Sequence, residues 1–257
     1  IWKKIKATYD ENLKNKRPQL IFQNYDVISK FLVSVLETDV DRVIVNSKNT
    51  YETVLEYLKK MGVSTLDEQG DNNLPAVAIG GFTNGISPLE MAGAYASIAN
   101  DGVYTKPIFF TKVVDSSGNT VLTANQEKTR VISEQNAYLT RSIVSEPTKS
   151  GGTATYCAIS GMDVAAKTGT TNESKDRWLC GFTPYYTGVT WYGYDKNESI
   201  NYNGKKNPAG ILWANIMSNV HSSLKNAKFN KPAGAVKVTV CAETGRKANT
   251  GCPNTYD

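Results

Sequence analysis

The residues best suited to chemistry in this sequence are Lys167, Thr168, Gly169 and Thr170, which follow the apolar stretch Val164–Ala166. The apolar stretch predicts a short strand that holds the backbone rigid. The lysine supplies a positive charge, the threonines supply hydroxyl donors, and the glycine lets another backbone come close. A sheet edge of this kind accepts an extended peptide as an added strand, while its ammonium and hydroxyls hold a carboxylate. We therefore expect a carboxylate-binding strand here.

The stretch and its flanks resemble a known family. Lys167-Thr168-Gly169 is similar to the Lys-Thr-Gly signature of penicillin-binding proteins and serine β-lactamases. The resemblance extends over about 61–257 and is closest to bifunctional, class A penicillin-binding proteins. The flanking stretches that carry it are Ala78–Ala92, Ala99–Tyr104, Gly151–Ala154, Thr170–Pro184 and Val189–Asp195.

This resemblance implies a transpeptidase-like α+β fold, with an antiparallel sheet flanked by helices on both faces. It implies a D,D-transpeptidase of peptidoglycan synthesis, which binds wall stem peptides and β-lactams, needs no cofactor and works outside the cytoplasm at the cell surface. Any membrane anchor would lie outside this chain. Lys167 would be the catalytic residue, orienting the carboxylate and favouring proton transfer, and Thr168, Gly169 and Thr170 would bind substrate.

The same resemblance implies a nucleophile that is not found here. Serine acyl transfer needs an attacking hydroxyl, a base and an oxyanion hole. The family carries its serine in a Ser-x-x-Lys motif on a helix and adds a Ser-x-Asn motif, both before the region similar to Ala78–Gly85. The only Ser-x-x-Lys in this chain begins at Ser222, after Lys167 and thus in the wrong order. We therefore expect a partial domain that is inactive as it stands.

Three stretches match Ser-x-Asn by letters, beginning at Ser47, Ser117 and Ser199. Two of them stand in turn-like sequence, and Ser47 follows an expected strand. Serine and asparagine side chains commonly hydrogen-bond to nearby backbone in turns. We expect local turn chemistry at all three.

The first sixty residues resemble a different family. Arg17–Ile28 and Asp41–Asn46 are similar to a segment of the ribonuclease E/G family, between its RNA-binding module and its nuclease domain. We expect a small α/β segment at 1–60 and a partial transpeptidase domain at 61–257. That family's metal-binding acidic residues belong to a segment absent here, so no nuclease site is expected. Nucleic acid would bind at most weakly, through 1–60, and a solvated charged helix face is the preferred interpretation.

Composition indicates a globular chain. It has 257 residues, of which 40% are hydrophobic and 21% charged, with a net charge of +5. No apolar run approaches the roughly 20 residues that a membrane span needs. The chain starts at Ile1 without a signal-peptide pattern, which suggests a piece of a longer protein.

The cysteines and the single histidine do not predict a metal site. No Cys-x-x-Cys pair occurs, so zinc is not expected. Cys241 and Cys252 bracket a short loop, and both a disulfide and free thiols stay open. Free, partly buried thiols fit Cys157 and Cys180 equally well. His221 is expected to be structural.

Several expected elements would position the Lys167 strand. Ser87, Pro88 and Glu90 predict a helix start with a capping box, running to a stop at Gly102. A hairpin is expected over 109–122, with strands at 178–183, 187–194 and 236–241. Trp178, Trp191 and Tyr194 are expected to pack in the core or on the sheet rather than to stack on a substrate. Helices are expected at 133–146 and 208–224, and helices at 1–16, 26–37 and 50–60 alternate with strands at 19–22 and 42–46. In the helix at 208–224, the residues expected to face inward are Ile211, Leu212, Ile216 and Val220.

Other functions stay open beside the partial transpeptidase. One is a non-catalytic module that binds wall peptide, which loss of peptide binding in Lys167→Ala would favour. Another is an RNA-processing fragment led by 1–60, which strongly salt-dependent RNA binding would favour. A third possibility is that the chain is a fusion of two unrelated segments and has no single function.

Overall fold

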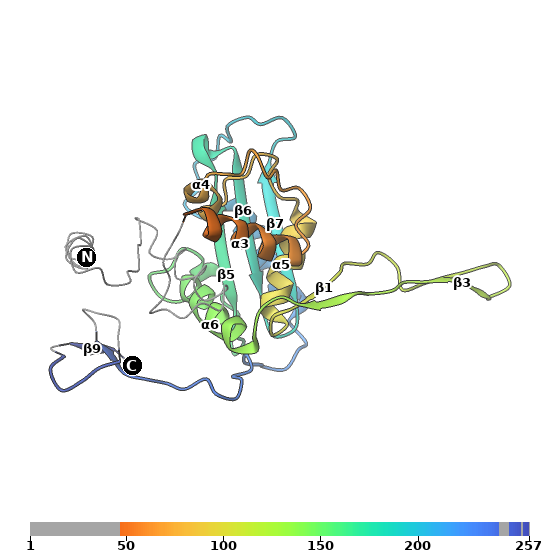
Figure 1. Cartoon of the computed structure of the whole chain (residues 1–257). Coiled ribbons are helices and arrows are strands. Elements are labelled where there is room, and N and C mark those ends of the chain that lie inside the picture. The colour runs from red at the N-terminus through yellow and green to blue at the C-terminus, as the bar shows by residue number, and fades with distance from the viewer. Residues whose placement is uncertain (1–46, 242–246, 253, 257) are drawn as a thin grey trace.

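A three-stranded antiparallel sheet forms the centre of the computed structural model, which describes residues 47–241, 247–252 and 254–256 (Figure 1). Its strands are β5 (Ala165–Thr170), β6 (Asp176–Phe182) and β7 (Thr187–Gly193), in the order β5-β6-β7. The short strand predicted to begin at the apolar stretch Val164–Ala166 and the strands predicted at 178–183 and 187–194 are therefore confirmed. β6 is central, and β5 forms one margin of the sheet in the described part of the chain. The helices and strands expected within 1–46 lie outside the described residues.

Helices cover both faces of this sheet, as expected for the predicted α+β fold. On one face, Ala166 and Leu179 pack with Trp213 and Met217 of α7 (Pro208–Val220). On the other face, Ala165 and Phe182 pack against α5 (Pro88–Ala99) and α6 (Glu134–Ser145). The other helical elements are α3 (Ser47–Lys60), α4 (Leu74–Ala78), η1 (Glu146–Thr148), η2 (Thr155–Cys157) and η3 (Asn172–Ser174).

The orientation of α7 differs from the sequence prediction. Ile211, Leu212, Ile216 and Val220 are 37%, 51%, 48% and 46% exposed, so their predicted inward placement is wrong. The buried side chains are instead Ala209, Trp213 and Met217. This helix is apolar on two arcs at the i, i+4, i+8 spacing, so periodicity does not choose between them. The arc that carries the large indole packs on the sheet, where Trp213 Nε1 also donates to the Gly188 carbonyl at 2.9 Å.

The predicted capping box at the start of α5 is present. Ser87 Oγ accepts from the backbone N–H of Glu90, and the Glu90 carboxylate accepts from the Ser87 N–H. The other Glu90 oxygen accepts from the N–H and hydroxyl of Ser64, in the loop after α3. Burial raises the pKa of Glu90, but these hydrogen bonds outweigh it and bring the pKa to about 2. The carboxylate thus joins two segments that are 26 residues apart.

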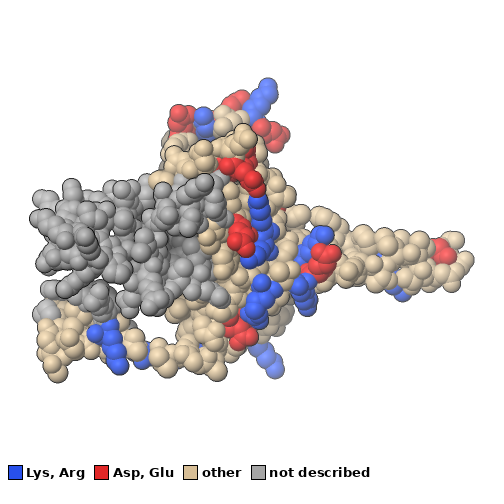
Figure 2. All heavy atoms as spheres, viewed as in Figure 1, with Lys and Arg blue, Asp and Glu red and all other residues tan. Residues whose placement is uncertain are grey.

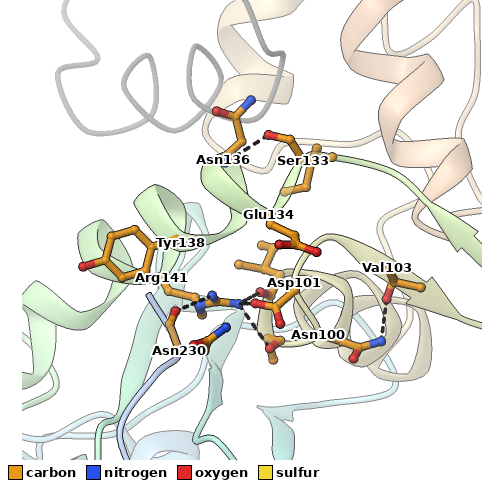
Figure 3. A network of polar contacts seen from close by, with 12 residues as sticks. Asn100, Asp101, Val103, Ser133, Glu134, Asn136, Tyr138, Arg141 and Asn230 are labelled. Carbon is orange, nitrogen blue, oxygen red and sulfur yellow. Dashed lines mark hydrogen bonds and ion pairs between the residues drawn. The ribbon is translucent and has the colours of Figure 1, made fainter. Parts of the chain in front are cut away.

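A buried arginine ties α6 to α5 and to the chain beyond α7 (Figure 3). Arg141 Nη1 donates to the carbonyls of Ile98 and Ala99 and pairs with Asp101 Oδ1 at 2.7 Å. Its Nη2 donates to the Asn230 carbonyl at 3.1 Å. The guanidinium therefore joins the interior of α6 to the C-terminal end of α5 and to the segment at Asn230.

The predicted hairpin is present and projects away from the sheet (Figure 1). It consists of β2 (Lys112–Val114) and β3 (Thr120–Thr123), all of whose residues are exposed. The carboxylate of Asp115 accepts from the backbone N–H groups of Ser117 and Asn119, so the stretch at Ser117 serves the turn, as predicted. The arm is joined to the body by β1 (Val103–Thr105), paired with β4 (Lys128–Arg130).

Only the end of the strand predicted at 236–241 forms, as β8 (Val240–Cys241) paired with β9 (Thr255–Tyr256). Cys241 and Cys252, both described, are not joined by a disulfide in the structure. Among the described residues no helix combines the length and hydropathy that a bilayer crossing requires. The same residues contain no cluster of three or more potential metal ligands from His, Cys, Asp and Glu.

Charges on the visible face are mixed. Figure 2 shows basic and acidic side chains side by side over the middle of the described part. Lys59 pairs with Glu68, and Lys60 pairs with Glu56 at 2.6 Å. On this face the described residues therefore form no extended patch of one sign, which is what phosphate-backbone binding needs.

The orientation of α7 is tested by two adjacent substitutions. Trp213→Ala should lower the free energy of unfolding by about 3–5 kcal/mol, because it empties a fully buried position. Leu212→Ala, on the exposed arc, should change it by less than about 1 kcal/mol. Urea unfolding measures both values, and a larger loss in Leu212→Ala would mean that the helix is turned the other way.

The Arg141 network is tested against a half-exposed neighbour. Arg141→Ala should cost about 3 kcal/mol in urea unfolding, because three carbonyls lose a buried charged donor. Arg130 also donates to the backbone carbonyl of Asp101 and pairs with Glu134, but its side chain is 52% exposed. Arg130→Ala should therefore cost less than about 1 kcal/mol. Equal losses would contradict a special role for the buried guanidinium.

Candidate functional site

Strand β5 places the predicted site at the sheet margin in a fixed register with β6. Lys167 lies opposite Cys180, and Thr170 lies opposite Arg177. Gly169 lies opposite Trp178, and a Cβ at this glycine would stand 3.0 Å from the Trp178 Cβ. A side chain at Gly169 would therefore crowd Trp178, and the two strands would have to move apart by a few tenths of an ångström to hold it.

Alternation along β5 divides the predicted site residues between two faces. Ala166 packs toward α7, so Thr168 and Thr170 lie on that face. Ala165 packs toward α5 and α6, so Lys167 lies on the opposite face. The structure brings the two threonines together and separates the lysine from them.

The two threonines line a pocket of about 160 Å³. Its other walls come from the turn between η1 and η2, from β6 and from the loop before α7. The side chains with polar groups that line it are Thr153, Thr168, Thr170, Arg177, Tyr202, Lys206 and Asn207. Hydroxyls and two cations on one small concave surface can bind an anion.

Hydroxyl groups on the pocket wall contact one another and Arg177. Thr153 Oγ1 lies 3.3 Å from Thr168 Oγ1, so the Gly151–Ala154 stretch of the family resemblance meets β5. Arg177 Nη1 donates to Thr170 Oγ1 at 3.3 Å, and Nη2 donates to the Ser174 hydroxyl at 3.2 Å. These contacts fix the walls of the pocket.

Asn207 joins the far wall of the pocket to the sheet. Its Nδ2 donates to the carbonyls of Gly169 at 3.3 Å and Trp178 at 3.1 Å. Its Oδ1 accepts from the Ala209 N–H and so caps the N-terminus of α7. One amide therefore starts the helix and holds it against the strand that carries the threonines.

Lys167 has different surroundings. Its Nζ donates to the Thr168 carbonyl at 2.9 Å. Desolvation lowers the pKa of Lys167, and the neighbouring Cys180 thiol opposes that shift. Burial raises the pKa of Cys180 to about 12, although Lys167 acts in the other direction. Lys167 is thus an ammonium with a reduced pKa on the face of β5 turned toward α5 and α6.

Trp178 and Trp191 act in packing, as predicted, whereas Tyr194 is 53% exposed, so its predicted packing is wrong. The rings of Trp178 and Trp191 lie 6.4 Å apart. Trp191 Nε1 donates to Asp176 Oδ1 at 2.9 Å, and the Thr171 hydroxyl donates to the other Asp176 oxygen. His221 is also structural: Nδ1 lies 2.7 Å from the Met217 carbonyl, which can only accept, so Nε2 accepts from the Thr183 hydroxyl.

The serine of the only Ser-x-x-Lys stretch lies far from the pocket, and the serines of the Ser-x-Asn stretches at 47 and 199 stand in different local structures. Ser222 follows the C-terminal end of α7, whose 13 residues span about 20 Å from the end held by Asn207. Its hydroxyl donates to the Asn219 carbonyl. Ser199 lies in an irregular loop, whereas Ser47 is the first residue of α3 and not part of a turn.

Comparisons with known proteins identify the family of this chain. The family model described as "Penicillin binding protein transpeptidase domain" matches residues 5–218. The chain belongs to this family. Its match crosses the boundary predicted near residue 60, and the ribonuclease-like assignment of 1–60 stays a prediction.

Relatives and solved structures agree with this membership. The chain is 31% identical over 194 residues to "Penicillin-binding protein 1A" of Clostridium botulinum, covering 76% of this chain and 23% of that protein. It is 34% identical over 182 residues to the protein of the same name from Clostridium acetobutylicum, covering 71% and 22%. The fold is similar to the crystal structure of Penicillin-Binding Protein 1A from Haemophilus influenzae, with a TM-score of 0.64, 23% identity, and 89% and 38% of the two chains covered. The chain spans about a quarter of the length of the curated relatives that it matches.

Sequence reasoning found the strand of this penicillin-binding domain but missed Arg177, Lys206 and Asn207. Strand pairing puts Arg177 beside Thr170, and the loop before α7 brings in the other two. The Asn207-Pro208 pair was the available signal, because asparagine before proline is a common helix start.

Asn207 is tested by two substitutions of different size. Asn207→Ala removes the helix cap and both bridging donors, and should cost about 2 kcal/mol in urea unfolding. Asn207→Ser keeps a capping oxygen, so its free energy of unfolding should lie between those of Asn207→Ala and the unaltered chain. The control is Asn219→Ala, on the same helix but bonded only within it, which should cost less than about 0.5 kcal/mol. Identical losses in the serine and alanine variants would argue against the cap.

Proposed function

We propose that this chain contributes the carboxylate-recognition side of a D,D-transpeptidase site in peptidoglycan synthesis. The observation that carries the proposal is the pair of hydroxyls of Thr168 and Thr170, side by side on marginal strand β5 and facing one pocket. The ligand is a wall stem peptide that ends in a free carboxylate, and a β-lactam carboxylate is the inhibitory counterpart. The place of action is the extracytoplasmic cell surface.

The sheet margin supplies the mode of binding. An extended peptide pairs with the outer backbone of β5 as an additional strand, and its terminal carboxylate accepts from the threonine hydroxyls. Gly169 lies between the two threonines in sequence, but its hydrogen side chain points to the opposite face of the strand, so the two hydroxyls are neighbours on their own face. A volume of about 160 Å³ suits a carboxylate and the small residue that bears it.

Lys167 has a separate role in this proposal. It lies across the strand from the threonines, and desolvation lowers its pKa. A lowered pKa favours exchange of a proton with a reacting group. In a site completed by a nucleophile, we assign Lys167 to proton transfer on the face turned toward α5 and α6, and the hydroxyl pocket to binding.

The second family motif has a candidate in Ser47-Lys48-Asn49. It lies inside the matched range and before Ala78, which is the order of the family, and Ser47 begins a helix. The attacking serine has no comparable candidate, because Ser222 lies at the distant end of α7. We therefore propose that this chain binds wall peptide and penicillin reversibly, without acylation.

Binding and acylation can be measured separately. Titration with a diacetyl-Lys-D-Ala-D-Ala peptide should give saturable binding, and Thr168→Val should raise Kd at least tenfold, since a hydrogen bond to a charged group is worth about 1.5–3 kcal/mol. The control is Thr123→Val, on the exposed arm, which should leave Kd unchanged. Intact mass after incubation with penicillin should show no adduct.

Two results would count against the proposal. Absence of peptide binding by the unaltered chain would remove carboxylate recognition. A stoichiometric penicillin adduct would show that a nucleophile is present, and peptide mapping would then identify it.

A further inference from the structure

The hydroxyl pocket contains two cations that the proposed binding mode does not yet use. Arg177 and Lys206 both line it. No carboxylate of the described residues forms an ion pair with either side chain. Two uncompensated positive charges beside three threonine hydroxyls give the pocket a strong preference for an anion.

Arg177 is held in place by neutral groups only. Its two terminal nitrogens donate to Thr170 and Ser174, and its Nε is buried without a partner among the described residues. A guanidinium has five N–H donors in a planar fork suited to carboxylate oxygens. Hydroxyl partners at 3.2–3.3 Å satisfy part of this capacity and leave the charge uncompensated.

The Arg177 contact also orients a hydroxyl. Thr170 Oγ1 accepts from Arg177, so the hydroxyl hydrogen of Thr170 is available for donation to a ligand. Lys206 is placed by a different contact, with its Nζ 5.3 Å from the centre of the Tyr156 ring. The two cations therefore approach the pocket from opposite walls, β6 and the loop before α7.

Lys167 does not supply the pocket's charge, because it lies on the other face of β5. We propose that Arg177, assisted by Lys206, is the specificity-determining cation of the pocket and selects peptides with a free terminal carboxylate over those with a neutral end. This inference rests on the proposed function. Arg177 would have two tasks: its positive charge would compensate the peptide carboxylate, and its hydrogen bond would orient the Thr170 hydroxyl toward that carboxylate.

The test compares the diacetyl-Lys-D-Ala-D-Ala peptide with its C-terminal amide, titrated against the full chain at low salt. The unaltered chain should bind the acid at least tenfold more tightly than the amide. Arg177→Gln should reduce this ratio to about twofold by weakening the acid alone, and Arg177→Lys should restore part of it. Added salt should lower the ratio in the unaltered chain.

Lys206→Met provides a second variant in a loop, and should lower the acid-to-amide ratio by about threefold. Its matched control is Lys205→Met, because Lys205 is the adjacent lysine and does not line the pocket. Circular dichroism and Tm verify the fold of each variant. The competing ligand chemistry, a free inorganic anion, is tested by adding inorganic phosphate, which should displace the acid peptide only at millimolar concentration or above.

The outcomes separate the two proposals. Failure of the unaltered chain to bind either peptide overturns the proposed function and this inference together. A tenfold preference for the acid that persists in folded Arg177→Gln and Lys206→Met overturns this inference alone. Displacement by micromolar phosphate would also overturn it, because the pocket would then be a site for free anions.

Discussion

The two-residue period of β5 is the constraint on which the rest of the site depends. Ala165 and Ala166 are fully buried on opposite faces of the sheet, one against α5 and α6 and the other against α7. A slip of one residue would exchange these faces and move every side chain of the strand to the wrong one. The apolar start of the strand therefore determines where its polar end points. The hydroxyls of Thr168 and Thr170 and the ammonium of Lys167 are consequently presented to two different environments, although the three residues lie within four positions of the chain.

Polar contacts outside the sheet support this arrangement by holding the covering elements in place. Arg141 joins α5, α6 and the Asn230 segment, and Asp163 accepts from the Phe229 N–H and the Lys228 ammonium on that same segment. Asn207 does the equivalent for α7 by bonding to β5 and β6 at once. Each is a polar side chain that satisfies backbone carbonyls or N–H groups where regular structure ends. The site thus depends on Arg141 and Asp163, which do not line the pocket, as well as on Asn207, which does.

Local signals in the sequence were sufficient for much of this fold. Ser87 with Glu90 specified the start of α5, and Asp115 to Asn119 specified the turn of the hairpin, because both involve contacts within a few residues. The face of α7 could not be predicted, since its two apolar arcs have the same spacing and only the fit of Trp213 on the sheet distinguishes them. The strand with Lys167 was found by its residues, but its division into two faces needed the buried partners of Ala165 and Ala166. Arg177 and Lys206 were missed because tertiary pairing, and no local pattern, brings them to the threonines.

The arm formed by β2 and β3 has a consequence for motion. Its seven strand residues are all exposed, and an isolated two-stranded hairpin is at best marginally stable in water. Its pairing can therefore break and re-form as a local event, with a free-energy cost far below that of global unfolding. The central sheet, covered on both sides, opens only with the whole domain. Backbone amide hydrogens should accordingly exchange with solvent slowly in the central sheet and rapidly in the arm.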